Sequence, residues 1–220
     1  MERYFDEELN ELRSNILKIG QLARSAISQS IEALKSRDVN LAKKIIENDQ
    51  QVDDLELYID EKCIDLLALY QPMAADLRFI TTGLKLNAEL ERIADLAVDI
   101  AQRVIVLADK PLLKPIIDIP RLGDVAQNMV RDSIESFIKR DVSIAKKVVD
   151  ADDEADMLKN KICDELINEY MAKDSTCVNR AVPLLLIARH LERICDHASN
   201  IAEDIFYMVQ GKVIKHHHNA

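Results

Sequence analysis

The chain repeats one pattern twice, and this duplication limits the folds that it can adopt. LERIADLAVDIA begins at Leu90, and LERICDHASNIA begins at Leu191. Upstream of each lies a second matching block, RDVNLAKKIIENDQQVD from Arg37 and RDVSIAKKVVDADDEAD from Arg140. Because both blocks recur at nearly the same spacing, the chain is a tandem duplication of units of about 100 residues. Each unit is large enough to have a hydrophobic core of its own.

Composition and heptad spacing predict that each unit is helical. The 220 residues include only 4 Gly and 5 Pro, whereas 48% are hydrophobic, a balance typical of long helices joined by few turns. Apolar residues alternate by four and three, the spacing of helices that pack as antiparallel bundles. The clearest runs are Phe5, Leu9, Leu12, Ile16, Ile19, Ala23 and Ala26; Leu86, Leu90, Ile93, Ala97, Ile100, Val104 and Leu107; and Ile187, Leu191, Ile194, Ala198, Ile201, Ile205 and Met208. The expected fold is all-α: two tandem antiparallel three-helix bundles with six long helices and no strand.

Helix-breaking residues set the expected boundaries. Asp38 and Asp141 each follow an arginine where a helix should end, and each can cap the next helix by accepting from free backbone N–H groups. Pro72 should end the second helix. In the second unit, a turn near residues 173–176 should take the place of this proline turn. Pro183 should kink the last helix. The expected divisions are a first bundle, a proline-containing linker, a second bundle and a polar tail: residues 1–110, 111–120, 121–212 and 213–220.

Charge, cysteine usage and hydropathy narrow the function classes. The net charge of −10 offers no basic field for phosphates, so a nucleic-acid partner is not expected. The four cysteines form no Cys-x-x-Cys pair and are interpreted as reduced thiols. The acidic N-terminal segment is not a signal peptide, and the longest apolar run, AVPLLLIA from Ala181, is too short to span a bilayer. We therefore expect a cytoplasmic protein that reaches membranes only through partners. The C-terminal KHHHNA is either a metal-binding tract or an ordinary polar tail or cloning remnant.

Acidic residues at spacings of four recur on two helices of each unit. They are Asp49 and Asp53 with Glu91, Asp95 and Asp99 in the first unit, and Asp152 and Asp156 with Glu192, Asp196 and Asn200 in the second. The heptad register turns these rows away from the apolar seam. Like charges at this spacing destabilise a helix by roughly 0.2–0.5 kcal/mol per pair. If neighbouring helices bring two rows together, the carboxylates cannot all stay ionised without a cation, and oxygen ligands suit hard ions such as Mg²⁺, Mn²⁺ or ferric iron.

Other interpretations of these rows remain open. A solvated acidic face is the usual meaning of a charge run. A ferritin-like di-iron enzyme also uses helix carboxylates, but it needs inward-facing Glu-x-x-His motifs, and this chain has none. His197 follows Asp196 and is a candidate ligand, although a lone histidine on a helix is more often a surface residue. No Ser–His–Asp arrangement, P-loop or glycine-rich phosphate cradle is visible, so no catalytic residue is expected.

Three segments give the chain a family resemblance. QPMAADLRFI from Gln71, LERIADLAVDIA from Leu90 and ARHLERICDHASNIAEDIFYMVQGK from Ala188 resemble the PhoU family. The resemblance covers nearly the whole chain, including the duplication and the proline turn. Ala94 and Cys195 stand where that family often has a glycine, and neither departure alters the assignment.

The resemblance implies a homodimer of paired three-helix bundles and a cytoplasmic, non-enzymatic regulator that represses the phosphate-starvation (Pho regulon) response. It implies two partners, the ATPase subunit of the phosphate ABC transporter and the phosphate sensor histidine kinase. It also implies metal clusters of iron, magnesium, manganese or zinc on the Glu/Asp-x-x-x-Asp motifs. The residues concerned are Asp49, Asp53, Glu91, Asp95, Asp99, Asp152, Asp156, Glu192, Asp196 and Asn200. Because Asn200 is neutral where Asp99 is anionic, we expect the second half to bind metal more weakly. The alternative function is a metal-binding helical protein with iron-storage or redox activity.

The motif Asp76-Leu77-Arg78 follows the proline turn and has no counterpart in the second unit. In the simpler interpretation, Asp76 caps a helix and Arg78 is solvated. In the alternative, Asp76 and Arg78 belong to a surface that contacts a partner, because duplication alone does not require the motif.

Overall fold

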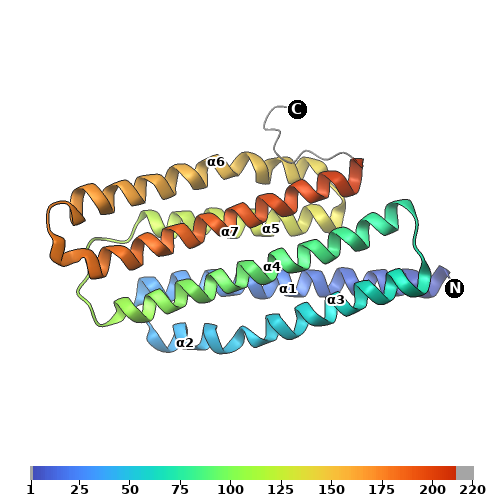
Figure 1. The fold of residues 1–220 in the computed structure, drawn as a ribbon, viewed down its shortest axis with the longest axis horizontal. Coiled ribbons are helices and arrows are strands. Elements are labelled where there is room, and N and C mark those ends of the chain that lie inside the picture. The colour runs from blue at the N-terminus through green and yellow to red at the C-terminus, as the bar shows by residue number, and fades with distance from the viewer. Residues whose placement is uncertain (1, 212–220) are drawn as a thin grey trace.

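The computed structural model describes residues 2–211, and these residues form an elongated bundle of long helices (Figure 1). The elements are α1 (Glu2–Ser36), α2 (Val39–Asn48), α3 (Gln50–Tyr70), α4 (Ala74–Ala108), α5 (Asp118–Lys139), α6 (Val142–Asp164), a π-helix (Glu165–Met171), a 3₁₀ turn (Ser175–Cys177) and α7 (Val178–Gln210). Asp49 between α2 and α3 has helical dihedral angles, φ −60° and ψ −33°, so the two segments act as one long helix. The described residues therefore contain six long helices and no strand, which confirms the predicted fold class. The histidine tract falls outside the described residues.

Both Arg-Asp steps end one helix and begin the next, as predicted. Arg37 and Arg140 adopt left-handed φ angles of 59° and 53°. The N–H of Asp38 returns to the carbonyl of Ala33, which closes α1, and the N–H of Asp141 closes α5 in the same way. The Asp38 carboxylate then accepts from two backbone N–H groups at the start of α2, and Asp141 accepts from one at the start of α6. The repeated dipeptide thus supplies both the stop and the cap.

The connection between the halves is shorter than the expected linker. Because α5 begins at Asp118, Pro120 lies in the first helical turn, where a missing N–H leaves no bond unmade. Pro183 lies inside α7, and the helix runs through it without a break. Pro183 has no N–H to donate to the carbonyl of Asn179, four residues before it. This carbonyl instead accepts a hydrogen bond from Lys110 Nζ at 2.8 Å.

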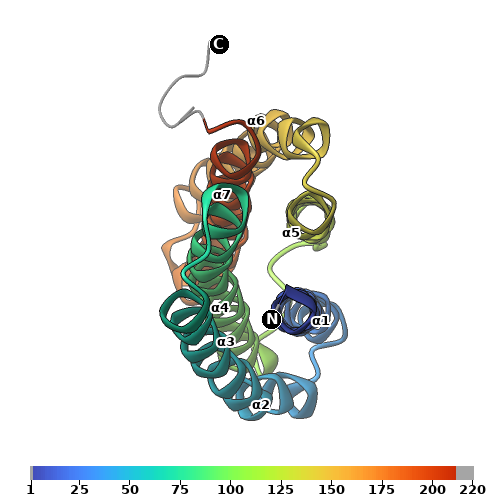
Figure 2. The ribbon, with the colours of Figure 1, turned by 90° about the vertical axis from the view of Figure 1, so that its right-hand side faces the viewer.

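The two duplicated units share one core. Each forms a three-helix bundle, and α4 packs along α7 while α1 packs along α5. Seen end-on, α4 and α7 lie on one side of the molecule and α1 and α5 on the other, with α6 and α2–α3 at the two edges (Figure 2). Phe79 of α4 and Phe137 of α5 are fully buried and stack with ring centroids 4.7 Å apart. The halves are therefore joined by core side chains and by helix faces.

Two glycines allow α1 and α5 to approach closely. A Cβ atom on Gly20 would lie 2.3 Å from Cδ1 of Ile134, and one on Gly123 would lie 2.8 Å from Cγ1 of Ile31. Gly20 and Gly123 occupy matching positions in the two units, as do Ile31 and Ile134. Each half thus inserts an isoleucine over the glycine of the other half.

The hydropathy of the described helices shows whether any of them could cross a membrane. Among residues 2–211, no helix combines the length and the apolar character needed to cross a membrane.

Candidate functional site

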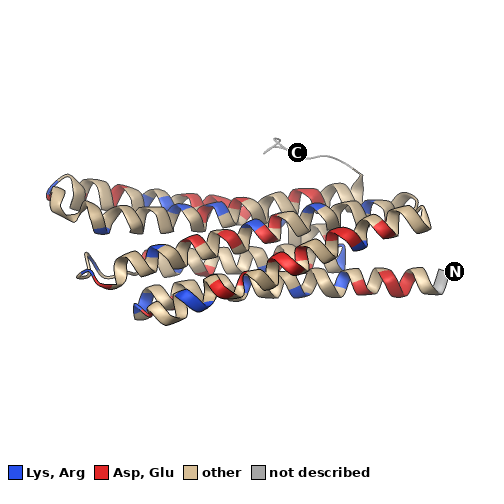
Figure 3. Cartoon of the chain, turned by 60° about the horizontal axis from the view of Figure 1, so that its bottom comes forward, with Lys and Arg blue, Asp and Glu red and all other residues tan. Residues whose placement is uncertain are grey.

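The first acidic patch forms where α2–α3 packs against α4. Figure 3 marks the acidic residues in red along the helices. Burial raises the pKa of Asp49 to about 6, and the charges of Asp53 on α3 and Asp95 on α4 add to the shift. Burial and the Asp95 charge likewise raise the pKa of Glu91. Four of the five predicted residues of this half therefore interact electrostatically across the contact between the helices.

Two further carboxylates belong to this patch and were not predicted. Burial raises the pKa of Glu56, with Asp60 and Asp53 contributing, and Glu56 also acts on Glu91. The sequence carries a signal for both, because they follow Asp53 by three and seven residues on one helix face. We define the first acidic patch as these six residues: Asp49, Asp53, Glu56, Asp60, Glu91 and Asp95.

Asp99, the fifth predicted residue of the first half, faces α7 and is not part of the first acidic patch. Its Oδ2 atom lies 3.8 Å from Nδ1 of His190 on α7. Burial lowers the pKa of His190, although the Asp99 charge opposes this effect. Asp99 thus takes part in the contact between the halves.

The second acidic patch forms where α6 packs against α7. Burial raises the pKa of Asp196 to about 6, and the charges of Glu192, Asp152 and Asp156 add to the shift. Burial also raises the pKa of Asp152. We define the second acidic patch as these four residues. The predicted Asn200 lies exposed on α7, one turn after Asp196.

His197, the candidate ligand, is engaged between the halves. Its Nδ1 atom lies 2.5 Å from a carboxylate oxygen of Glu89 on α4. The His197 charge also lowers the pKa of Asp196, the residue before it in the chain. Glu89 is therefore the partner that fixes this ring.

The chemistry of the patches suits hard cations, but their side chains are not gathered around one point. Among the residues that the structure describes, no three His, Cys, Asp or Glu side chains lie close enough to hold a metal ion as they stand. The donors of the first patch are all carboxylates, and their mutual repulsion is what an added cation would relieve. The donor set of the first patch therefore fits a hard metal ion, provided that the side chains reorient.

Arg78 and Asp76 connect elements at one end of the bundle. Arg78 Nε donates to the carbonyl of Met208 at 3.0 Å, which ties the start of α4 to the end of α7. Asp76 lies 4.0 Å from a guanidinium nitrogen of Arg140, and it stands in the first turn of α4, whose N-cap residue is Met73. The simpler interpretation is therefore wrong for Arg78, which is bonded to the second half and not solvated. The Met73 N-cap places Asp76 inside the first turn of α4, near Arg140 of the second half.

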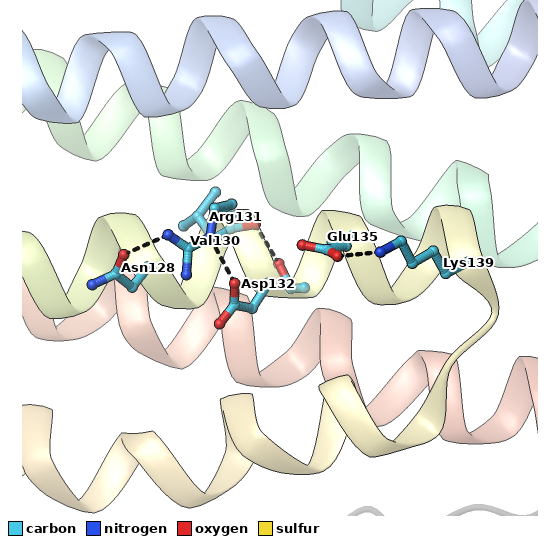
Figure 4. A network of polar contacts seen from close by, with 7 residues as sticks. Asn128, Val130, Arg131, Asp132, Glu135 and Lys139 are labelled. Atoms are coloured by element: carbon cyan, nitrogen blue, oxygen red, sulfur yellow. Dashed lines mark hydrogen bonds and ion pairs between the residues drawn. The ribbon is translucent and has the colours of Figure 1, made fainter.

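A cavity of about 250 Å³ lies between α1 and α5. Its lining includes Arg131 and Lys139 of α5. Arg131 donates to the side chains of Asn128 and Asp132 at 3.0 and 2.8 Å, and Lys139 donates to Glu135 (Figure 4). These two cations are paired, whereas Arg24 of α1 also lines the cavity and its buried Nε atom has no hydrogen-bond partner among the described residues.

Comparison with known proteins agrees with this architecture. A model of the PhoU domain matches residues 16–104 and 119–205, once in each half. The chain is 42% identical over 212 residues to the "phosphate-specific transport system accessory protein PhoU homolog" of Aquifex aeolicus, covering 96% of both chains. It is 35% identical over 213 residues to the homolog of Clostridium acetobutylicum, covering 96% of this chain and 97% of that one. The crystal structure of PhoU from Pseudomonas aeruginosa superposes with a TM-score of 0.90 at 34% identity, covering 94% of this chain and 100% of that one. The chain therefore belongs to the PhoU family.

Proposed function

We propose that this protein regulates phosphate uptake and represses the phosphate-starvation response without catalysing a reaction. The observation that carries the proposal is the match of both duplicated units to the PhoU domain, together with relatives named as accessory proteins of phosphate-specific transport. In this role, the protein acts in the cytoplasm as a homodimer. It couples the ATPase subunit of the phosphate ABC transporter to the phosphate sensor histidine kinase, so that ample phosphate keeps the starvation genes repressed.

The end of the bundle where α4 begins is the proposed contact surface for these partners. Asp76 and Arg78 lie there, and Leu69, Met73 and Leu77 leave apolar side chains exposed nearby. An exposed apolar surface next to charged residues is typical of a protein–protein contact. The interhelical bond of Arg78 would hold this surface in place.

Deletion of the gene tests the regulatory role. The starvation genes should stay expressed in phosphate-rich medium, because the repressing contact is lost, and a reporter fused to one of them measures this. Returning the gene should restore repression. Normal repression in a deletion strain that has no second copy would contradict the proposal.

We further propose that the first acidic patch binds hard multivalent cations, with iron, magnesium, manganese or zinc as candidates. Asp49 and Asp53 on one helix and Glu91 and Asp95 on the next would hold the ion. The raised pKa values of Asp49 and Glu91 support this, because an added positive charge favours their ionised forms. The ion would supply charge and join two helices. The patch lies at the surface and lacks the dry cavity that metal catalysis requires, so iron-storage or redox activity gains no support.

Titration with MnCl₂ in a calorimeter tests the cation site. The double variant Asp53→Asn with Asp95→Asn should lose affinity by about tenfold or more, because two of the donors become neutral. Asp65→Asn, an exposed carboxylate on α3 outside the patch, is the matched control and should bind as the wild type does. Equal affinity in the double variant and the control would exclude this patch as the site.

A further inference from the structure

The duplication places opposite charges at one matching position of the two patches. Glu56 follows Asp53 by three residues on α3, and Lys159 follows Asp156 by three residues on α6. Asp53 and Asp156 are themselves matching members of the repeated block. At this single position, the first patch therefore gains an anion where the second gains a cation.

Lys159 lies between the two helices that carry the second acidic patch. Its Nζ atom is 3.2 Å from a carboxylate oxygen of Asp156 on α6 and 3.3 Å from one of Glu192 on α7. The Asn160 side-chain oxygen accepts a hydrogen bond from the same ammonium at 3.1 Å. Only 22% of the Lys159 side chain is exposed. The ammonium thus joins α6 to α7 in the way that a bound metal ion would.

Lysine carries a positive charge at neutral pH. The second patch therefore carries its positive charge at neutral pH.

The first patch has no equivalent bridge. Glu56 adds a carboxylate at the position that Lys159 occupies in the second patch. Arg92 contacts Glu91 at 3.5 Å and Asp95 at 3.1 Å, but all three residues lie on α4, and the Arg92 side chain is 63% exposed. The Arg92 charge also acts on Glu56 of α3, but at this exposure water screens it, whereas Lys159 contacts carboxylates of two helices.

We infer that Lys159 is a built-in counter-ion of the second acidic patch. The residues at the matching positions 56 and 159 together determine which patch takes up multivalent cations. An entering metal ion meets positive charge at the second patch and must displace the ammonium. The first patch holds an extra carboxylate there and depends on ions from solution. The inference rests on the proposed cation binding only for the first patch, since the role of Lys159 in the second can be measured separately.

Exchanging the charges tests the selectivity, with MnCl₂ as the probe and the full-length chain. Lys159→Glu should add a second Mn²⁺ binding event that the wild type lacks. Glu56→Lys should weaken the existing one by about tenfold or more, as expected from the reversal of a neighbouring charge. Lys159→Arg keeps the charge and should bind like the wild type.

Melting temperature tests the counter-ion role without relying on the first patch. In the presence of a chelator, Lys159→Gln should melt at a lower temperature than the wild type, because the second patch loses its cation. Millimolar Mn²⁺ should restore most of the lost melting temperature. Lys161→Gln is the matched control, because Lys161 lies on the same helix but pairs with Asp118 of α5 at 3.1 Å. Added Mn²⁺ should not recover any loss in this variant.

The outcomes separate the two proposals. If Lys159→Glu binds no more Mn²⁺ than the wild type, or if Lys159→Gln responds to Mn²⁺ no more than Lys161→Gln, the inference about Lys159 is overturned. If the wild type and Glu56→Lys both bind no Mn²⁺ while Lys159→Gln is restored by it, the counter-ion role stands and cation binding at the first patch fails.

Discussion

At the scale of single residues, Asp49 shows what the acidic patches cost the fold. Burial, with the charges of Asp53 and Asp95, raises its pKa to about 6. In the unfolded chain the same carboxyl has a pKa of about 4. Between these two values the folded state binds a proton that the unfolded state has released. The Asp49 contribution to stability therefore falls as pH rises from about 4 to about 6, and the full cost persists above that range.

Asp49→Asn should remove this cost. The Asp49 side chain makes no capping hydrogen bond, so the amide loses none. In chelator at pH 7, the free energy of unfolding should rise by roughly 1 kcal/mol, a value already reduced for solvent screening of a half-exposed group. Near pH 4 the gain should almost vanish. Urea unfolding at both pH values measures this, with Asp65→Asn as the exposed control, and lower stability of Asp49→Asn at pH 7 would contradict the argument.

The candidate site was only partly predictable from the residues. Spacing of four found Asp49, Asp53, Glu91 and Asp95, because acidic pairs on one helix face are visible in the sequence. The role of Lys159 was not visible, since a lysine at a spacing of three is ordinary on a helix surface. Its contact with α7 depends on how far apart the two helices pack, and heptad spacing does not give that distance.

At the scale of helices, the crossing of α1 and α5 depends on Gly20. An alanine there places Cβ 2.3 Å from Cδ1 of the buried Ile134. Overpacking costs roughly 1–3 kcal/mol, which exceeds the gain of about 1 kcal/mol that alanine brings to a helix. Gly20→Ala should therefore lower the free energy of unfolding by about 1 kcal/mol, measured by urea denaturation.

Two further variants decide whether the clash is the cause. Adding Ile134→Val to Gly20→Ala removes the clashing methyl group and should restore much of the stability. Gly123→Ala meets Cγ1 of Ile31 at 2.8 Å, an atom nearer the backbone that moves less freely than a terminal methyl group, so it should cost at least as much as Gly20→Ala. If the double variant is no more stable than Gly20→Ala alone, the Ile134 contact does not limit the crossing.

Helix positions were predictable, but local breaks in their hydrogen bonding were not. The heptads gave the buried faces, and Asp38 and Asp141 gave the caps, because both signals are local. The break at Asp49 and the π-helix at Glu165–Met171 left no such signal. A π-turn widens the helical hydrogen-bond spacing by one residue, and this one contacts α7. Such adjustments depend on tertiary contacts.

At the scale of the whole molecule, the duplicated halves share one hydrophobic core, so we expect them to unfold as one unit. The sequence predicted a core for each half, and the structure joins these into one through α4 with α7 and α1 with α5. Arg78 adds a hydrogen bond between the start of α4 and the carbonyl of Met208. Neither half could separate without exposing the long apolar faces that it shares with the other.

Phe137→Ala tests this cooperativity, because the ring belongs to α5 but stacks on Phe79 of α4. Removing a fully buried phenylalanine costs about 3–5 kcal/mol. If the core is shared, the loss should fall on both halves alike, since the globally protected amides of each exchange through the same unfolding step. Hydrogen exchange should therefore show equal loss of protection in α4 and α7. Loss confined to α5–α7, with wild-type protection in α1–α4, would mean that the two units unfold separately and that their contact is an interface between two domains.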